Sequence, residues 1–278
     1  MLDFNYHIHS TFSDGQSPMW QMTQQAHRSG FKHIAITDHG PVPFQNDWSI
    51  DQSARKAYIK MINEQKELYP DMNIFRGLEL DYIPGVTADF QKLKEIWELE
   101  VVVGSVHLVK HPESGKLWFI DGPQQNYDSG LDKIFNQDIE KGVKTYFYQI
   151  NEMLRTQKPD IIGHIDKIRM NNMKRYFSPS ESWYQELLEE TLTNVKSCNC
   201  ILEINPRGFY KGKTEDLFPS DAALEIIRDK HIPVTINTDA HKTDELSKGH
   251  EKAVKKLKET GISSVKRLTE NGWEDYTL

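Results

Sequence analysis

The amino-acid sequence predicts an α/β fold in which parallel strands form one closed or nearly closed barrel. Short apolar, β-branched segments alternate with longer amphipathic segments along the 278 residues. This alternation is typical of repeated βα units. No low-complexity tract, repeat of fixed period or linker divides the chain, so a single barrel domain over residues 1–278 is favoured over two domains.

The strands of this barrel can be placed in order along the sequence. Ser17 followed by Pro18 is typical of a helix start, and Gly30 is typical of the end of that helix. The segment 110–130 is rich in Gly, Pro, Asn and Asp, and we interpret it as a lid or specificity loop. The predicted strands are 4–9, 33–38, 74–83, 101–109, 161–165, 200–205 and 233–239, with 264–268 as a weaker last candidate.

Composition and charge exclude several classes of partner. The formal net charge of -7 argues against a general nucleic-acid binder, which would carry a basic face, so small ligands are the expected partners. Cys198 and Cys200 lie too close together to form the disulfide framework of a secreted protein. The sequence has neither a signal-peptide pattern nor an apolar run of about 18 residues. We therefore expect a cytoplasmic protein without a membrane partner, whose oligomeric state stays open.

Side chains that bind metal ions fall at the ends of the predicted strands. His7 and His9 are two residues apart in a strand, so both point to the same side and could hold one ion. An isolated pair of this kind would more often be two core histidines. Here Asp14 lies close by, the other candidates lie late in later strands or just after them, and the C-terminal ends of parallel strands meet at one face of a barrel. The candidate ligands are His7, His9, Asp14, His39, Glu79, His107, His164, Asp239 and His241.

Seven ordered motifs resemble those of the polymerase and histidinol phosphatase (PHP) superfamily, and within it those of histidinol phosphatases. They are HIHSTFSDG, AITDHG, RGLELDY, GSVH, IGHID, EINPRG and NTDAH, between Asp3 and His241. The resemblance implies a distorted (β/α)7 TIM-like barrel with two or three divalent ions, of zinc, manganese or iron, at the C-terminal ends of the strands. It also implies a metal-dependent phosphatase of a small phosphorylated metabolite, with L-histidinol phosphate as the expected substrate.

The resemblance further divides the candidate ligands among three ions. The first ion would be held by His7, His9, Glu79 and Asp239. The second would share Glu79 and be held also by His107 and His164. The third would be held by Asp14, His39 and His241. Some relatives carry a histidine at the position of Asp14, so a site with two ions is the alternative.

Six more residues are candidates for catalysis or substrate binding. Clustered ions would neutralise a phosphate ester, and a water bridging two of them would have its pKa lowered from 15.7 towards about 7. Arg207 is expected to clamp phosphate oxygens, or else to be a surface side chain in a turn. Asp166 could protonate the leaving alkoxide or brace a ligand, and Asp81 could orient a metal-bound histidine. Trp118, Phe119 and Asp121 could cover the imidazole and amine of histidinol, although an aromatic pair in a loop more often packs the loop down.

Three other functions are consistent with these motifs. One is another phosphoesterase of the same superfamily, such as a protein tyrosine phosphatase or a nuclease, the latter disfavoured by the acidic charge. A second is an amidohydrolase-type barrel, which also begins with two histidines but usually bridges its metals with a lysine near the end of strand four. The third is a metal-binding barrel without catalytic activity. A phosphatase assay with and without chelator tests this third function.

Overall fold

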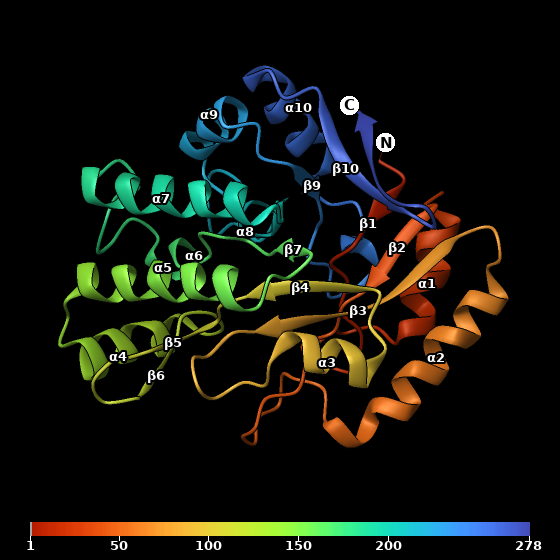
Figure 1. The fold of residues 1–278 in the computed structure, drawn as a ribbon, viewed down its shortest axis with the longest axis horizontal. Coiled ribbons are helices and arrows are strands. Elements are labelled where there is room, and N and C mark those ends of the chain that lie inside the picture. The colour runs from red at the N-terminus through yellow and green to blue at the C-terminus, as the bar shows by residue number, and fades with distance from the viewer. Residues whose placement is uncertain (1) are drawn as a thin grey trace.

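Seven strands pair in parallel in the order β1-β2-β3-β4-β7-β8-β9 in the computed structural model, which describes residues 2–278 (Figure 1). Their β-branched and aliphatic side chains are buried, which suits strands covered by helices. The strands are β1 (Phe4–Asn5), β2 (His33–Ile36), β3 (Asn73–Asp81), β4 (Val101–Ser105), β7 (Ile161–Ile162), β8 (Ile201–Ile204) and β9 (Val234–Ile236).

The first and last strands of this order meet and nearly close the barrel. Ile8, beyond the end of β1, forms a parallel bridge with Ala240, beyond the end of β9. The amide of His9 donates to the carbonyl of Ala240 at 2.8 Å, and the amide of Ala240 donates to the carbonyl of His7 at 3.1 Å. Residues 7–9 and 239–241 are therefore neighbours at the C-terminal end of the barrel.

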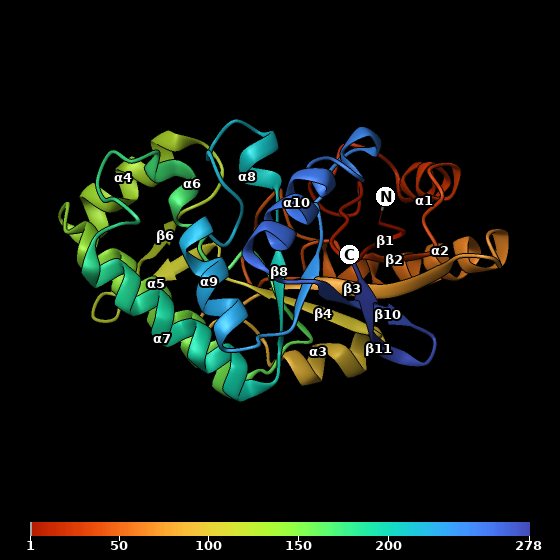
Figure 2. The same cartoon turned by 90° about the horizontal axis from the view of Figure 1, so that it is seen from above.

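Helices cover the outside of the barrel, and α5 packs beside α7 on one flank (Figure 2). The first helix begins at Met19 with Pro18 at the N-cap position, and Gly30 follows its end with a φ of 82° as expected. No helix within residues 2–278 combines the length and apolar character needed to cross a membrane. The helices are α1 (Met19–Arg28), α2 (Arg55–Leu68), α3 (Phe90–Trp97), α4 (Gln124–Phe135), α5 (Ile139–Thr156), α6 (Arg169–Asn172), α7 (Ser182–Cys198), α8 (Arg207–Tyr210), α9 (Asp221–Asp229) and α10 (His250–Thr260).

The seven predicted barrel strands are confirmed in position, but several end earlier than expected. Strand β1 stops at Asn5 rather than at residue 9, and β7 stops at Ile162 rather than at residue 165. Beyond β1 every second amide bonds to a side chain: that of Ile8 donates to Thr37 Oγ1 at 3.0 Å, and that of Ser10 donates to Asp38 Oδ1 at 2.7 Å. Because these amides bond to side chains, the regular pattern of hydrogen bonds between strand backbones ends where the candidate ligands begin.

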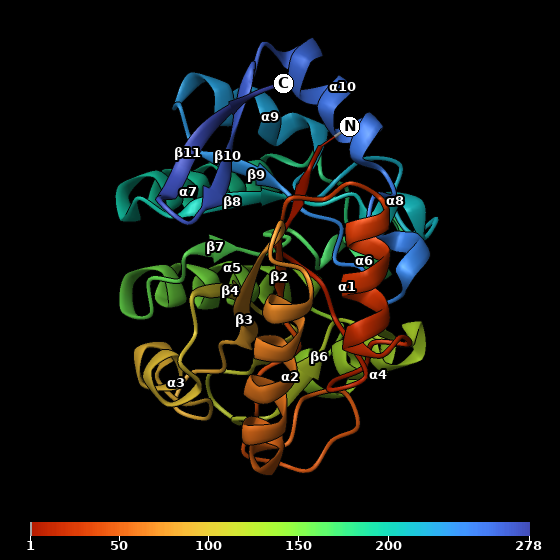
Figure 3. The same cartoon turned by 90° about the vertical axis from the view of Figure 1, so that its right-hand side faces the viewer.

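Two other segments differ from the expectation. Residues 110–130 do not form an irregular loop, because β5 (Leu108–Lys110) and β6 (Leu117–Phe119) form a hairpin that leads into α4. The weaker strand candidate 264–268 lies in β10 (Ser264–Thr269), which pairs antiparallel with β11 (Gly272–Thr277) instead of joining the barrel. The Tyr6 hydroxyl accepts from the amide of Leu268 at 2.8 Å and ties this hairpin to the barrel. The hairpin lies beside β9 (Figure 3).

Candidate metal centre

His7 and His9 point into the C-terminal end of the barrel from the segment that follows β1, and both are fully buried. His7 Nε2 lies 3.2 Å from Glu79 Oε2. His9 Nε2 lies 3.5 Å from the same oxygen and 3.3 Å from Asp239 Oδ1. The alternation of side chains along an extended chain therefore brings both imidazoles to the same carboxylates.

Glu79 is the central residue of the cluster. Its Oε2 atom faces His7, His9 and His39, with His39 Nδ1 at 3.0 Å. Its Oε1 atom faces His164 Nε2 at 2.9 Å and His107 Nε2 at 3.5 Å. One carboxylate with imidazoles on both oxygens has the arrangement of a group that bridges two cations.

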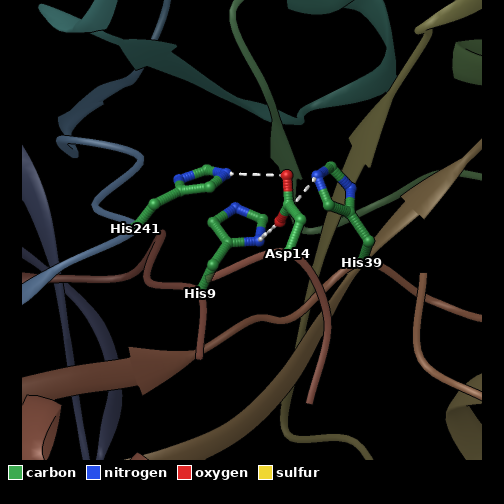
Figure 4. Close-up of side chains that lie close together, drawn as sticks. All are labelled: His9, Asp14, His39 and His241. Carbon is green, nitrogen blue, oxygen red and sulfur yellow. Dashed lines mark hydrogen bonds and ion pairs between the residues drawn. The ribbon is translucent and has the colours of Figure 1, made fainter. Parts of the chain in front are cut away.

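A second carboxylate, that of Asp14, gathers three imidazoles nearer to solvent (Figure 4). Its oxygens lie 3.2 Å from His241 Nε2, 3.7 Å from His39 Nε2 and 3.8 Å from His9 Nδ1. The side chain of Asp14 is 35% exposed, so this part of the cluster lies at the opening of the site. His9 thus stands between the two carboxylates.

Asp239 completes the cluster from the end of β9. Its backbone has a positive φ of 54°, which is uncommon for a residue with a side chain but tolerated by aspartate. Its Oδ1 atom lies 3.3 Å from both His9 Nε2 and His241 Nδ1. Backbone strain at such a position is typical of functional sites, where surrounding contacts hold the conformation.

The structure brings all nine candidate ligands together, and the donor atoms fit divalent cations. Four groups have ligand atoms within 4.8 Å of one another: His9, Asp14, His39 and His241; His7, His164 and Asp239; His7, His9 and Glu79; and His39, Glu79 and His107. Several buried atoms here make no hydrogen bond, namely His7 Nε2, both ring nitrogens of His9, His39 Nδ1, Glu79 Oε2 and Asp239 Oδ2. Burying unpaired polar atoms is costly, and cations bound among them would remove that cost. Imidazole and carboxylate donors suit zinc, manganese or iron.

The charges of the cluster keep its carboxylates ionised but do not keep every imidazole neutral. Burial would lower the pKa of His7, whereas the Glu203 and Glu79 carboxylates raise it well above its ordinary value. Burial would raise the pKa of Glu79, but the imidazole of His7 and its neighbours hold it well below its ordinary value. Burial would also raise the pKa of Asp239, and Arg207 with other cations keeps it well below its ordinary value. The pKa of His39 is lowered well below its ordinary value by burial. Ionised carboxylates and a neutral imidazole are the protonation states that a metal ion requires.

Asp81 contacts a candidate ligand as the sequence indicated. Its Oδ2 atom lies 2.9 Å from His107 Nδ1, and its Oδ1 atom accepts from the amide of His107 at 2.8 Å. Burial would lower the pKa of His107, but Asp81 raises it to about 9. With Nδ1 facing this carboxylate, His107 presents Nε2 to Glu79.

Two basic side chains face the cluster. Arg207 donates from Nη1 to the carbonyl of Asp239 at 2.6 Å, and its Nε lies 3.6 Å from Asp239 Oδ2. Lys167, which the sequence analysis missed, places its buried Nζ 3.3 Å from His107 Nε2 and 3.6 Å from Asp239 Oδ2. Asp121 forms an ion pair with this lysine, with Oδ2 2.8 Å from Lys167 Nζ. The cluster is therefore flanked by two cations and one further carboxylate.

Asp166, a candidate for proton transfer or for bracing a ligand, has its contacts away from the candidate ligands. Strand β7 ends at Ile162, and the amide of Lys167 donates to the carbonyl of His164 in a turn. The carboxylate of Asp166 instead accepts from Arg169 Nε at 2.7 Å and from the amide of Ser220 at 3.0 Å. The turn brings Lys167, three residues after His164, to the cluster instead.

Trp118, a candidate substrate contact, has the alternative role of packing its segment down. Its indole is fully buried and donates from Nε1 to the carbonyl of Tyr127 at 2.9 Å, so it packs the hairpin against α4. The next residue, Phe119, is partly exposed on the other face of β6, with its ring 6.2 Å from that of Trp48. The Trp48 ring lies 5.4 Å from that of His39. Phe119 and Trp48 thus form an aromatic wall beside the cluster, and the alternation along β6 is the signal that separates Phe119 from Trp118.

Comparison with known proteins identifies relatives along most of the chain. A PHP domain model matches residues 5–207. The histidinol-phosphatase of Bacillus subtilis strain 168 is 23% identical over 259 residues, which cover 88% of this chain and 96% of that protein. The histidinol-phosphatase of Lactococcus lactis subsp. lactis strain IL1403 is 26% identical over 246 residues, which cover 87% of this chain and 85% of that protein.

A solved structure shares the fold over nearly the whole chain. The histidinol phosphate phosphatase of Lactococcus lactis subsp. lactis Il1403, complexed with zinc, L-histidinol and phosphate, matches with a TM-score of 0.71 and 20% identity. The match covers 99% of this chain and 100% of that chain. Because the PHP domain model matches well over half of the sequence, the chain belongs to the PHP domain family.

Proposed function

We propose that this protein is a metal-dependent phosphomonoesterase that hydrolyses L-histidinol phosphate to L-histidinol and phosphate. The observation that carries the proposal is the cluster of nine candidate ligands with two cationic side chains beside it. The names of the relatives from Bacillus and Lactococcus, and the L-histidinol and phosphate in the Lactococcus structure, support the choice of substrate.

Two or three divalent ions of zinc, manganese or iron would supply Lewis acidity and lower the pKa of a bound water. The chain's own contribution begins with phosphate binding. Arg207 and Lys167 lie on the Asp239 side of the cluster, where their N–H groups can donate to phosphoryl oxygens. Both side chains are largely buried, so their charges act in a region of low dielectric constant and stabilise the dianion strongly.

The opening of the site provides contacts for the alcohol part of the substrate. Phe119 and Trp48 offer flat apolar faces, against which an imidazole ring can stack. Asp121 offers a carboxylate for the substrate ammonium group. Burial would raise the pKa of Asp121, but the Lys167 ammonium lowers it, so this carboxylate is ionised at neutral pH. A phosphate ester that also carries a ring and an amine would use all three contacts.

The remaining proposals concern the ligand set and the location of the protein. We assign all nine candidate ligands to the metal centre, with Glu79 as the shared carboxylate. His9 lies among the groups around both Glu79 and Asp14, so it can serve either ion. We place the protein in the cytoplasm, where its two free cysteines would stay reduced.

The test is a chelation and reconstitution experiment with several phosphate esters. Protein stripped with a chelator should lose activity, and added Zn²⁺, Mn²⁺ or Fe²⁺ should restore it. L-histidinol phosphate should be hydrolysed with a higher kcat/KM than p-nitrophenyl phosphate or a phosphotyrosine peptide. Failure on every ester with metal bound would refute the enzymatic proposal, whereas activity on p-nitrophenyl phosphate alone would refute only the substrate.

A further inference from the structure

Glu203 of β8 lies inside the barrel below the ligand cluster, and its carboxylate is fully buried. Oε1 lies 2.7 Å from His7 Nδ1. Oε2 accepts a hydrogen bond of 2.8 Å from the backbone amide of His164. The same carboxylate therefore contacts two candidate ligands that come from different strands, and neither contact is visible in the sequence motifs.

Two asparagines hold Glu203 in this position. Asn205 Nδ2 donates to Oε2 at 2.8 Å, and Asn237 Nδ2 donates to Oε1 at 3.1 Å. Asn237 also accepts from the amide of Tyr6 at 2.8 Å, which links the carboxylate to the segment that carries His7. With these contacts both oxygens are saturated, which is what a buried carboxylate requires to be tolerated.

The contact with His7 determines which nitrogen faces the cluster. An imidazole whose Nδ1–H donates to a carboxylate keeps the lone pair of Nε2 free. His7 Nε2 lies 3.2 Å from Glu79 Oε2, on the side of the candidate ligands. The other tautomer would direct an N–H group at the cluster, and His7 could then not bind an ion.

The contact with His164 takes the place of a backbone hydrogen bond between strands. The regular part of β7 ends at Ile162, two residues before His164. The amide of His164 donates to the side chain of Glu203 rather than to a backbone carbonyl of a neighbouring strand. The backbone of His164, and with it the imidazole that lies 2.9 Å from Glu79 Oε1, is therefore placed by the Glu203 carboxylate.

We propose that Glu203 is a positioning residue that fixes His7 and His164 together for metal binding. His7 and His164 form one of the donor groups with Asp239, so displacement of Glu203 disturbs two of its three members. Asp81 has the same kind of contact with His107 but reaches only that one ligand. The inference rests on the metal centre proposed above and is independent of which phosphate ester is the substrate.

The test measures zinc affinity in Glu203→Gln by competition with a chelating dye, on the full chain and without any phosphate ester. Glutamine keeps the size of the side chain but loses its charge and presents an N–H group to one of its partners. Loss of such a partner of a metal-bound histidine weakens metal binding roughly 10- to 100-fold, and we expect a loss of that size. Glu203→Asp keeps the charge but shortens the reach, and should weaken zinc binding as well.

Asp166→Asn is the matched control. Asp166 is also a fully buried carboxylate, but it bonds to Arg169 and Ser220 and not to the cluster. This variant should lower the melting temperature of the metal-free protein while changing the zinc Kd less than about twofold, within the range of an indirect effect. Long-range ¹H–¹⁵N NMR of the zinc-loaded wild type should show the proton of His7 on Nδ1.

Three results would overturn the inference. They are an unchanged zinc Kd in both Glu203 variants, an equal loss of affinity in Asp166→Asn, and a His7 proton on Nε2 in the zinc-loaded protein. A chain that binds zinc in a manner dependent on Glu203 but hydrolyses no ester would leave the inference intact and refute the proposed function. If Glu203→Gln does not fold, as judged by circular dichroism, Glu203→Asp and the NMR measurement decide the outcome.

Discussion

His7 Nε2 lies 3.9 Å from Asp239 Oδ1, although His7 follows the first strand of the barrel order and Asp239 the last. The two residues meet only because the bridge between Ile8 and Ala240 closes the barrel beyond the ends of β1 and β9. An ion held by both would tie the start of the chain to a segment more than two hundred residues away. The unfolded chain offers no such site.

Metal binding should therefore stabilise the fold. A ligand that binds only the folded state at 100 times its Kd adds about 2.7 kcal/mol to the free energy of unfolding. We expect urea unfolding in excess Zn²⁺ to show a stabilisation of that order over chelated protein. An equal free energy of unfolding with and without the ion would contradict a site that joins the two ends of the barrel.

Removal of the shared carboxylate should remove both metal and activity. Glu79→Gln leaves five imidazoles without their common anion. We expect bound metal, measured by elemental analysis, to fall by at least one ion per chain and turnover to be lost, because a ligand shared by two ions is missing. His250→Phe, in α10, is the control and should retain both; full metal content in Glu79→Gln would refute the assignment.

Arg207 and Lys167 should contribute to catalysis without contributing to metal content. Loss of one charged donor to a phosphoryl group should lower kcat/KM by roughly 10²- to 10³-fold. We expect losses of this size in Arg207→Gln and Lys167→Met, measured at saturating metal. Arg207→Lys should recover only part of the activity, because an ammonium cannot form the paired contact of a guanidinium. Metal loss in either variant would mean that the side chain supports the ligands instead.

Substitution of Trp118 should lower the stability of the fold, whereas substitution of its neighbour Phe119 should lower activity. Trp118→Ala empties a fully buried position and should lower the free energy of unfolding by about 3–5 kcal/mol. Phe119→Ala should leave stability nearly unchanged but lower kcat/KM for L-histidinol phosphate by up to about tenfold, the worth of one aromatic contact. The kcat/KM for glycerol phosphate, which has no ring, should fall less in the same variant. An equal loss on both esters would argue against stacking.

His250 should make stability depend on pH. Burial lowers the pKa of His250 to about 4, whereas an unfolded histidine titrates at about 6.5. Protons therefore bind preferentially to the unfolded chain, and the stability present above pH 6.5 is lost as the pH falls towards 4. Between pH 7 and pH 5 the loss should be roughly 2 kcal/mol. Urea unfolding of chelated wild type and His250→Phe should differ by this amount in their pH dependence; parallel profiles would contradict it.

The sequence by itself determined which residues gather at the site. Seven apolar segments alternate with helices, and side chains that bind metals fall where those segments end. Parallel strands in a barrel present their C-terminal ends at one face, so the position of His7, Glu79 and Asp239 relative to the strands was sufficient to predict their proximity. This inference needs only the order and period of the pattern, which are local properties of the chain.

Only the tertiary structure decided which neighbours of those residues face the ligand cluster. Lys167 rather than Asp166 reaches the cluster because β7 ends at Ile162 and a turn follows. Glu203 reaches His7 across the barrel interior, a relation between β8 and the end of β1 that no local pattern contains. The residue at which a strand ends depends on which distant side chains accept hydrogen bonds from its backbone amides. These side chains reach the strand only when the barrel closes.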